Sequence, residues 1–465
     1  MKKIYCLVMI ILLCSDHFAT AQIYRSQNIS MLSNWFDPAV LPEPSYGIKY
    51  NGIWGWADPA GNEYAIIGST AGTYFVNVTN PASPVQSDFV ASRRDSCIWH
   101  EIKTYEHYCY IVSDDVPTNS LQIVDMSYLP DSVHVVYDSN TLFETSHTIW
   151  IDGNKLYGGY VRGGSVSYSA MAVFDISNPV APVLLRKVED DYPGIFPYAH
   201  DMYVRNDTIF ASCGYAGLFV FKLDSTNHFQ LLASMTSYPN QGYNHSSALT
   251  DDGHTLIFCE EVPDGQPVRS VDVSNLGNMT ILTSFESDSD ATPHNPFIMG
   301  NILFLAYYQD GLQVYDISNP SAPVRLGYFD THWQNDALGN YPAPADAGCW
   351  GAYPWLPSGN VIASDMQNGL YTLDVSTITG VKHHTSSNQI LIYPNPSVGN
   401  VLYGNFSSSL VQHTKYEVIN MEGQLVERNF LLDNQINIEH LTPGIYSLRL
   451  ISDEVISVQK FVRVK

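Results

Sequence analysis

One phrase recurs along most of this 465-residue chain. It runs through alternating apolar residues into Asp-Ile-Ser-Asn-Pro and continues towards Ala-Pro-Val. The clearest copies are residues 311–320 and 171–179, and residues 72–81 form a third copy with Asn77 at the aspartate position. Weaker copies centre on Asp125, Lys222, Asp272 and Asp374. The anchors at positions 77, 125, 175, 222, 272, 316 and 374 are separated by 44 to 58 residues, which indicates a repeat architecture.

A period near fifty residues with strand-type alternation is typical of the four-stranded blades of a β-propeller. The first two strands of a blade are expected at positions such as 98–105 and 108–113. The repeat phrase is the third strand, and a segment such as 183–188 is the fourth. The aspartate of the phrase is expected to be structural, because a carboxylate before a tight turn accepts backbone N–H bonds. Seven copies therefore predict an all-β fold with a seven-bladed β-propeller.

The last copy, residues 368–376, has no convincing fourth strand after it. Residues 29–37 resemble residues 324–330, which follow the copy at Asp316. We therefore expect residues 28–37 to complete the last blade, because pairing the two ends of the array removes an exposed edge.

The first 21 residues have the pattern of a signal peptide. Lys2 and Lys3 precede an apolar run at residues 7–13, and Ala19-Thr20-Ala21 forms a small-x-small cleavage site before Gln22. The run is too short to cross a bilayer, and no later run reaches the roughly 18 apolar residues that a span needs. We expect export, a mature chain beginning at Gln22, and no transmembrane segment.

Five cysteines remain after residue 21, namely Cys97, Cys109, Cys213, Cys259 and Cys349. None has C-x-x-C spacing, so a zinc ribbon or a thioredoxin-type site is unsupported. Export permits a disulfide across one hairpin between Cys97 and Cys109. Isolated buried thiols are the alternative for all five.

The repeat phrase resembles the LVIVD repeats of bacterial surface proteins. Residues 51–59 and 63–68 look like the opening of the "choice-of-anchor B" family of exported LVIVD propellers fused to varying C-terminal anchors. Residues 198–201 are similar to a Tyr-Thr-His-Asp segment of that family, although Ala199 departs from it. The resemblance covers about residues 28–380 and implies a propeller domain at 22–382. The family carries no settled biochemical activity to transfer.

Composition changes after a short polar linker at residues 383–389. Residues 390–465 contain six Lys or Arg and seven Asp or Glu, whereas the whole chain has a net charge of −24. Four signals follow in order, at residues 393–396, 416–420, 441–448 and 459–465. This order resembles the C-terminal sorting domain of the type IX secretion system of Bacteroidetes. The alternative is a generic carbohydrate-binding or adhesion sandwich.

The resemblance to sorting domains has several implications for residues 390–465. Such domains are small β-sandwiches that direct passage across the outer membrane, usually with removal of the domain. It therefore implies that the type IX secretion machinery is a partner. It also implies passage through the periplasm to a secreted or cell-surface location.

Five histidines stand at similar distances before their anchors, and they are His100, His147, His200, His245 and His294. Each is expected on the first strand of its blade, where it lines the central channel. In the other two blades, residues 53–55 and 349–351 align with 98–100, so glycine is expected in place of histidine. Several imidazoles at one level could hold Zn²⁺, Cu²⁺, Ni²⁺ or Fe²⁺. Each could instead bond to backbone, to a neighbouring blade or to channel water.

Acidic loop clusters are a second kind of candidate cation site. They are Asp114-Asp115, Glu260-Glu261, and Asp288 with Asp290. They could hold Ca²⁺, but none has the spacing of a known calcium loop, and solvated loops are the preferred interpretation. Glu101 and Asp201 each follow a channel histidine and could support a metal ligand.

Two classes of function remain from the sequence. The acidic net charge disfavours nucleic-acid binding. One class is a non-enzymatic surface or extracellular protein that binds a glycan or a protein. The other is a metal-dependent hydrolase or lyase that uses the histidine-lined channel. The first class is preferred, because no nucleophile–base or acid–base pair can be assigned.

Overall fold

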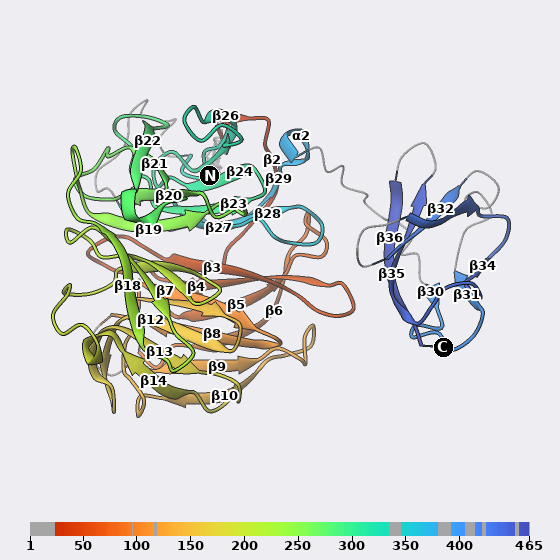
Figure 1. The fold of residues 1–465 in the computed structure, drawn as a ribbon, viewed down its shortest axis with the longest axis horizontal. Helices are drawn as coiled ribbons and strands as arrows, with labels where there is room; N and C mark the ends of the chain where they lie inside the picture. Colours follow the sequence, from red (N-terminus) through yellow and green to blue (C-terminus); the bar gives the residue numbers. More distant parts are fainter. Residues whose placement is uncertain are drawn as a thin grey trace, which may run out of the picture. The chain divides into compact units, whose positions relative to one another are not determined.

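The computed structural model describes residues 24–94, 96–115, 119–333, 346–379, 392–404, 414–420, 425–451 and 455–464. The expected signal peptide and linker lie outside these residues. The chain divides into two compact units, residues 1–381 and 382–465, and each is described by itself (Figure 1). Among the described residues, none of the helices has the length and apolar character needed to cross a membrane.

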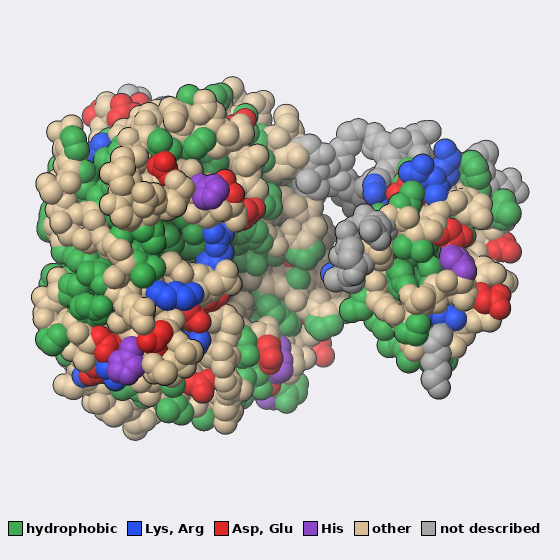
Figure 2. All heavy atoms as spheres, in the orientation of Figure 1, with side chains coloured by type: hydrophobic (Ala, Val, Ile, Leu, Met, Phe, Trp, Pro, Cys, Tyr) green, Lys and Arg blue, Asp and Glu red, His purple; other side chains and the backbone are tan. Residues whose placement is uncertain are grey.

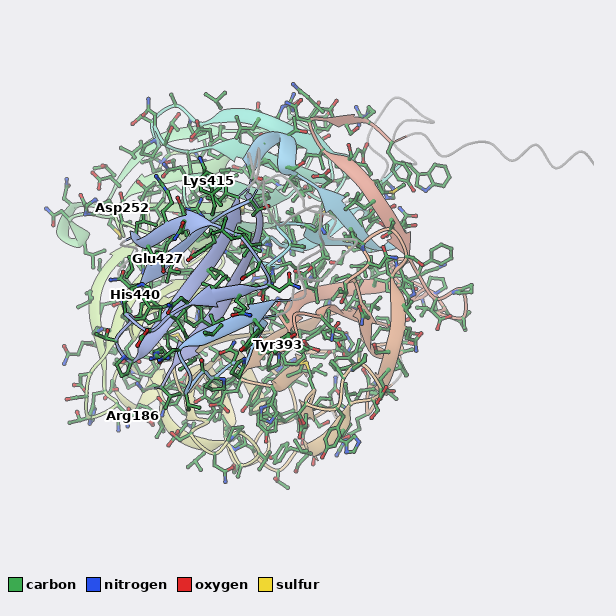
Figure 3. All side chains as sticks on the ribbon, turned by 90° about the vertical axis from the view of Figure 1, so that its right-hand side faces the viewer. Arg186, Asp252, Tyr393, Lys415, Glu427 and His440 are labelled. Atoms are coloured by element: carbon green, nitrogen blue, oxygen red, sulfur yellow. The ribbon has the colours of Figure 1, made fainter. Side chains whose placement is uncertain are left out.

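The described part of the first unit forms seven antiparallel sheets, which follow one another around a circle (Figure 3). Blades 1 to 3 comprise β3 (Tyr50–Ala57), β4 (Glu63–Ser69), β5 (Gly72–Asn77), β6 (Val85–Ala91); β7 (His100–Tyr105), β8 (Tyr108–Ser113), β9 (Leu121–Asp125), β10 (His134–Ser139); and β11 (Thr148–Asp152), β12 (Lys155–Gly163), β13 (Ser167–Asp175), β14 (Val183–Lys187). Blades 4 and 5 comprise β15 (Asp201–Arg205), β16 (Thr208–Ser212), β17 (Leu218–Leu223), β18 (Phe229–Met235); and β19 (Asn244–Leu249), β20 (Thr255–Glu260), β21 (Val268–Asp272), β22 (Thr280–Phe285).

Blades 6 and 7 take strands from both ends of the unit. Their strands are β1 (Ser26–Gln27), β23 (Asn295–Met299), β24 (Ile302–Ala306), β25 (Leu312–Asp316), β26 (Val324–Phe329); and β2 (Ser30–Trp35), β27 (Cys349–Tyr353), β28 (Val361–Asp365), β29 (Gly369–Asp374). Short helical turns η1 (Val188–Asp190), η2 (Leu276–Asn278) and α2 (Ser376–Thr379) complete the elements. The predicted seven-bladed propeller is confirmed.

The repeat phrase forms the third strand of each blade, and the Asp or Asn at its anchor position bonds to the following turn in every blade except blade 4, where the anchor is Lys222. Asp175 Oδ1 accepts the Ser177 backbone N–H at 2.8 Å. The same bond recurs two residues after Asn77, Asp125, Asp272, Asp316 and Asp374. A side chain that satisfies a backbone donor in this way ends the strand and starts the turn. The expected structural role of this aspartate is therefore confirmed.

Ring closure is also confirmed, and it uses the strand that follows Ile29. β2 pairs antiparallel with β29, from Ser30 opposite Asp374 to Trp35 opposite Leu370. β1 adds a fifth strand to blade 6 by pairing with β26. The Ile29 side chain is buried in the cluster between blades 6 and 7, so closure buries apolar surface as well as backbone.

The propeller core lies between neighbouring blades. Seven clusters of buried side chains each join two sheets that are adjacent around the ring. Phe174, for example, packs on Phe143 with ring centroids 5.4 Å apart. Burying a side chain of this size stabilises the fold by roughly 1.5–3 kcal/mol. On the face in Figure 2, Lys and Arg side chains are scattered among acidic ones and do not form a stripe.

The five described cysteines are buried and free. The possible disulfide between Cys97 and Cys109 is therefore wrong. Cys109 lies opposite Thr104 in the β7–β8 hairpin, whereas Cys97 precedes β7. The Asn119 side-chain amide donates a hydrogen bond of 3.3 Å to Cys97 Sγ. The isolated buried thiol is the alternative that the structure supports.

The C-terminal unit is a small sandwich of two sheets. One sheet has the order β30 (Ile392–Tyr393), β31 (Val401–Gly404), β34 (Gln435–Asn437), and the other has the order β33 (Leu425–Phe430), β32 (Lys415–Asn420), β35 (Gly444–Ile451), β36 (Val455–Arg463). Leu402 and Ile436 of the first sheet share one core with Val418, Leu448 and Phe461 of the second. The expected β-sandwich is confirmed.

Candidate functional site

Four of the five predicted histidines gather at one end of the first strands. His245 lies within β19, whereas His147, His200 and His294 immediately precede β11, β15 and β23. The ring centroids are 4.2 Å apart for His147 and His200, 4.4 Å for His200 and His245, and 4.2 Å for His245 and His294. The first strands contact one another around a closed ring, so this histidine arc curves around the mouth of the central channel.

Backbone carbonyls fix three of these rings. His200 Nδ1 lies 3.3 Å from the His245 carbonyl oxygen, and His245 Nδ1 lies 3.1 Å from that of His294. His294 Nδ1 in turn lies 2.5 Å from the Trp350 carbonyl oxygen. A carbonyl can only accept, so Nδ1 of each ring carries the proton and donates it. Nε2 of a neutral ring then keeps its lone pair, which is the form of imidazole that ligates metals.

The arc differs in charge along its length. Burial lowers the pKa of His245 to about 4 and holds the pKa of His200 and His294 well below the usual value. Burial acts in the same direction on His147, but the Asp114 carboxylate 2.8 Å from its Nδ1 outweighs it and raises the pKa of His147 to about 9. At neutral pH the arc therefore has one charged ring beside three neutral ones.

His100 does not join the arc. Its Nε2 lies 2.9 Å from the Ser92 hydroxyl, and the side chain is buried between blades 1 and 2, where its Cβ approaches Gly68. Burial lowers the pKa of His100 to about 4. The expectation of five imidazoles at one level is therefore wrong for this residue, although its strand position was predicted.

The prediction that glycine takes the place of histidine in blades 1 and 7 is also wrong. In blade 7 the neighbour of His294 is Trp350, with ring centroids 4.5 Å apart. In blade 1, Gly55 lies near the far end of β3, where a Cβ would be 2.2 Å from Cδ1 of Tyr353. A register shift interrupts each hairpin just here, between Tyr50 and Ile53 and between Cys349 and Gly351. A bulge adds a residue that alternation alone does not reveal.

Glu261 lies beside His245 of the histidine arc, and the sequence analysis named it only as a member of an acidic pair. Its Oε2 lies 3.8 Å from His245 Nε2, and its Oε1 accepts a 2.8 Å bond from the Tyr308 hydroxyl. Burial raises the pKa of Glu261. The available signal was the pair Glu260-Glu261 at the end of a strand, which was interpreted as a solvated loop.

That interpretation is wrong for two acidic pairs. Glu260 is fully buried and its Oε2 lies 3.0 Å from Arg269 Nε. Asp114 is paired with His147, and Asp115 accepts the Trp99 backbone N–H at 2.9 Å. All three carboxylates therefore have hydrogen-bond or ion-pair partners within the fold.

A small pocket of about 20 Å³ lies inside the arc and is lined by Glu101, His147, Thr148, His200, Asp201, His245, His294, Asn295 and Trp350. A cavity of this size holds about one water molecule or ion. Asp201 accepts a 2.8 Å bond from the Thr148 hydroxyl, and burial raises its pKa. Glu101 is ion-paired with Lys103.

Aromatic rings fill the channel beyond the carboxylates. Lys103 Nζ lies 4.3 Å from the Trp54 ring centroid and 5.5 Å from that of Trp150. Trp54 also contacts Tyr353 and Trp355, at 5.0 and 6.0 Å. A buried ammonium over indole faces is stabilised by cation–π attraction. Lys103 and these indoles therefore pack behind Glu101, which lines the pocket.

A chain of aromatic contacts runs from buried Trp350 and Tyr243 beside the arc outward to exposed Tyr46 and Tyr215. On one side, Trp350 stacks on Trp99 at 5.1 Å, and Trp99 contacts Tyr46 at 6.0 Å. On the other side, His200 contacts Tyr243 at 5.1 Å, which in turn contacts Tyr215 at 5.1 Å. We call Tyr46, Trp99, Tyr198, Tyr215, Tyr243 and Trp350 the aromatic rim. Tyr215 is 66% exposed and Tyr46 is 44% exposed.

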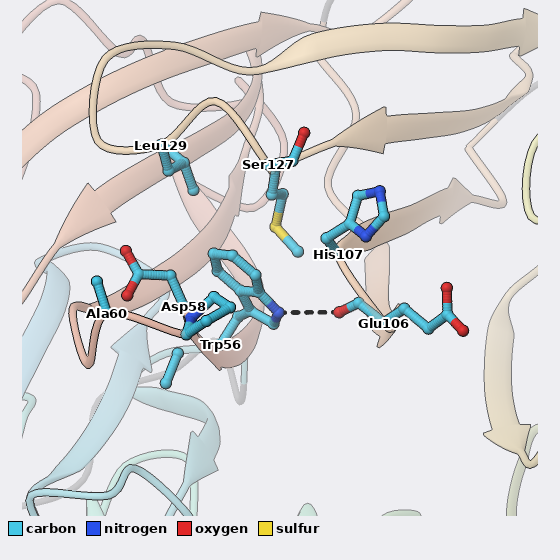
Figure 4. A pocket seen from close by; sticks show the side chains of 10 residues that line it. Trp56, Asp58, Ala60, Glu106, His107, Ser127 and Leu129 are labelled. Atoms are coloured by element: carbon cyan, nitrogen blue, oxygen red, sulfur yellow. Dashed lines mark hydrogen bonds between the residues drawn. The ribbon is translucent and has the colours of Figure 1, made fainter. Parts of the chain in front are cut away.

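A larger groove of about 540 Å³ lies at the opposite end of β7, beside the β7–β8 turn (Figure 4). Trp56 forms one wall and donates its indole N–H to the Glu106 carbonyl at 2.9 Å. Its other walls include Asp58, His107 and Leu129. No feature of the sequence pointed to this groove.

Comparisons with known proteins agree with this architecture. A family described as "Secretion system C-terminal sorting domain" matches residues 391–465, and one described as "LVIVD repeat" matches residues 148–190 and 297–331. The comparison with curated proteins finds no match.

Three solved structures are similar to this chain at low identity. PorZ, a surface component of the type IX secretion system of Porphyromonas gingivalis, is 10% identical with a TM-score of 0.46. The match covers 92% of this chain and 61% of PorZ, so this chain spans less than two thirds of that structure. The Cps50 (Swd1) β-propeller domain of Myceliophteria thermophila is 9% identical with a TM-score of 0.48, covering 74% of this chain and 98% of that one. A protein from Lactobacillus plantarum is 10% identical with a TM-score of 0.48, covering 84% and 98%.

These structural similarities carry no inference about function. The assignment of this chain therefore rests on its two family matches and on its fold. The matched repeats lie in blades 3 and 6, and the matched tail is the C-terminal sandwich. The sorting domain indicates export to the cell surface or the extracellular space. The protein is an exported LVIVD-repeat β-propeller that ends in a type IX secretion C-terminal sorting domain.

Proposed function

We propose that this protein is a glycan-binding protein of the cell surface and that the ligand docks on the aromatic rim. The observation that carries the proposal is the unbroken run of ring contacts from Tyr46 through the histidine arc to Tyr215. Exposed aromatic side chains that cluster beside a polar pocket are typical of binding sites.

The chemistry of the rim suits a sugar. The C–H face of a pyranose ring is apolar and packs on an indole or phenol, whereas its hydroxyls need donors and acceptors. Tyr198 and Tyr243 offer hydroxyls that are 2.9 Å apart, and Glu261 offers a carboxylate beside them in the arc. Buried tyrosines combine an apolar body with a polar tip, which fits such a mixed surface.

Binding explains the channel carboxylates better than hydrolysis or lysis does. A general acid and base need free carboxyl groups directed at the substrate. Glu101 is ion-paired with Lys103, and Asp201 accepts bonds from Thr148 and the Met202 backbone N–H. These two groups therefore hold the inner strands together.

A glycan array probed with the purified full-length protein tests the proposal, followed by calorimetry with the best glycan. We expect Trp99→Ala and Tyr215→Ala each to weaken binding at least tenfold, because truncating an aromatic anchor costs about 2 kcal/mol or more and tenfold corresponds to about 1.4 kcal/mol.

Tyr128→Ala is the matched control. Tyr128 is 50% exposed and follows β9 on the opposite side of the propeller, where it stacks on His134. This variant should bind as the unmodified protein does. Binding of peptides in place of glycans, or loss of binding in Tyr128→Ala alone, would contradict the proposal.

A further inference from the structure

We propose that His200, His245 and Glu261 form a binding site for one transition-metal ion, with Zn²⁺ or Fe²⁺ as the fitting ions. The ligand atoms of these three residues lie within 4.8 Å of one another. The sequence pattern suggested metal binding by five histidines, and the structure narrows the ligands to two histidines and a carboxylate from a different strand end.

The donor set determines the class of ion. Two imidazoles with one carboxylate is the ligand set of many non-haem iron sites and of open zinc sites. Ca²⁺ takes six to eight oxygen ligands, so a set with two nitrogen donors disfavours it. Two neutral imidazoles and one carboxylate leave coordination positions for water or another ligand.

Hydrogen bonds from neighbouring groups orient all three ligand side chains. The Nδ1 protons of His200 and His245 are held by backbone carbonyls at 3.3 and 3.1 Å, which directs Nε2 away from the backbone. Tyr308 donates a 2.8 Å bond to Glu261 Oε1, while Oε2 is the atom nearer to His245. Such bonds orient metal ligands and fix the tautomer of the histidines.

The surroundings also favour a cation. His200 and His245 line the small pocket of about 20 Å³ inside the arc, and the Asp201 carboxyl group lines the same pocket. The metal would sit at the centre of the aromatic rim.

Direct metal uptake tests this inference and needs no glycan. The full-length protein is purified without a polyhistidine tag, stripped with EDTA, and titrated with Zn²⁺ by calorimetry and with Co²⁺ by visible absorption. We expect one ion per chain. Loss of an outer partner typically weakens metal affinity 10–100-fold, so Glu261→Gln and His245→Ala should each weaken it at least about 100-fold.

His100→Ala is the matched control, because His100 occupies the same strand position in blade 2 but its Nε2 is bonded to Ser92. This variant should bind Zn²⁺ as the unmodified protein does. Tyr308→Phe should weaken binding about tenfold and keep the stoichiometry. A melting curve of each metal-free variant shows that it is folded.

Two results would overturn the metal site. One is a stripped protein that takes up none of Zn²⁺, Co²⁺ or Fe²⁺. The other is unchanged affinity in Glu261→Gln. Glycan binding by a metal-free protein would leave the proposed function standing, and metal uptake by a protein that binds no glycan would leave the metal site standing.

Discussion

The hydrogen bond from the Ser177 backbone N–H to Asp175 Oδ1 stabilises a turn that recurs around the propeller. Asp175→Ala should lower the melting temperature by about 1–2 °C, because a lost side-chain cap on a backbone N–H costs about 1 kcal/mol and the propeller unit is large. Asp175→Asn keeps an acceptor oxygen, as Asn77 does in blade 1, and should melt within about 0.5 °C of the unmodified protein at pH 7. Thermal melts by circular dichroism measure both.

The same turn predicts a pH dependence. Bonds from the Ser177 side chain and backbone lower the pKa of Asp175, and Ser318 does the same for Asp316. A pKa that is lower in the folded state gives stability that is present above the unfolded pKa and is lost as the pH falls through the folded pKa. Asp175→Asn should therefore lose less stability than the unmodified protein between pH 7 and pH 3. Equal losses would contradict this assignment.

Individual residues also show where prediction from the sequence ends. His147, His200, His245 and His294 were predicted close to their observed places, at or next to the start of a first strand, because each lies 22 to 28 residues before an anchor. Trp350 was missed because a bulge shifts the register by a residue. Glu261 was named only within an acidic pair: it follows β20, the strand that pairs with the strand of His245, but its bond with Tyr308 joins two blades, and no local pattern encodes that contact.

At the scale of elements, β2 supplies the outer strand of blade 7. Asn34 donates side-chain bonds to the carbonyls of Asn368 and Leu370, and Trp35 packs on Tyr74 with ring centroids 5.2 Å apart. Deleting residues 22–37 should lower the melting temperature by at least about 5 °C or cause aggregation, because it exposes the edge of β29. Calorimetry and light scattering measure this, and an unchanged melting curve would count against closure.

The strands themselves were predicted well, for a physical reason. Each hairpin of a blade is local, and each third strand ends at the same side-chain cap, so a single repeat contains the information for a sheet. The pairing of β2 with β29 was predicted from likeness to another fourth strand. The aromatic contacts that fill the channel were not predicted. Trp54, Trp150 and Trp355 belong to three different blades and come together only at the axis of the propeller.

At the scale of the whole molecule, the two units have separate cores, and the C-terminal core contains only residues of its own sandwich. Truncation after Asn388 should therefore leave the propeller folded but retained in the periplasm. Cell fractionation and surface protease accessibility, with a melting curve of the truncated protein, measure this. Normal surface delivery of the truncated protein would show that the sorting domain is not required.

The pairing of β2 with β29 also sets an order of events during synthesis. Asn34 and the Leu370 carbonyl that it bonds are 336 residues apart in the chain. At about 5–20 residues per second, a ribosome needs roughly 15–70 s to make the intervening polypeptide. For that interval β2 lacks its partner β29, and the first six blades emerge while the ring is still open. The nascent propeller is thus an incomplete circle until β29 (Gly369–Asp374) has been made.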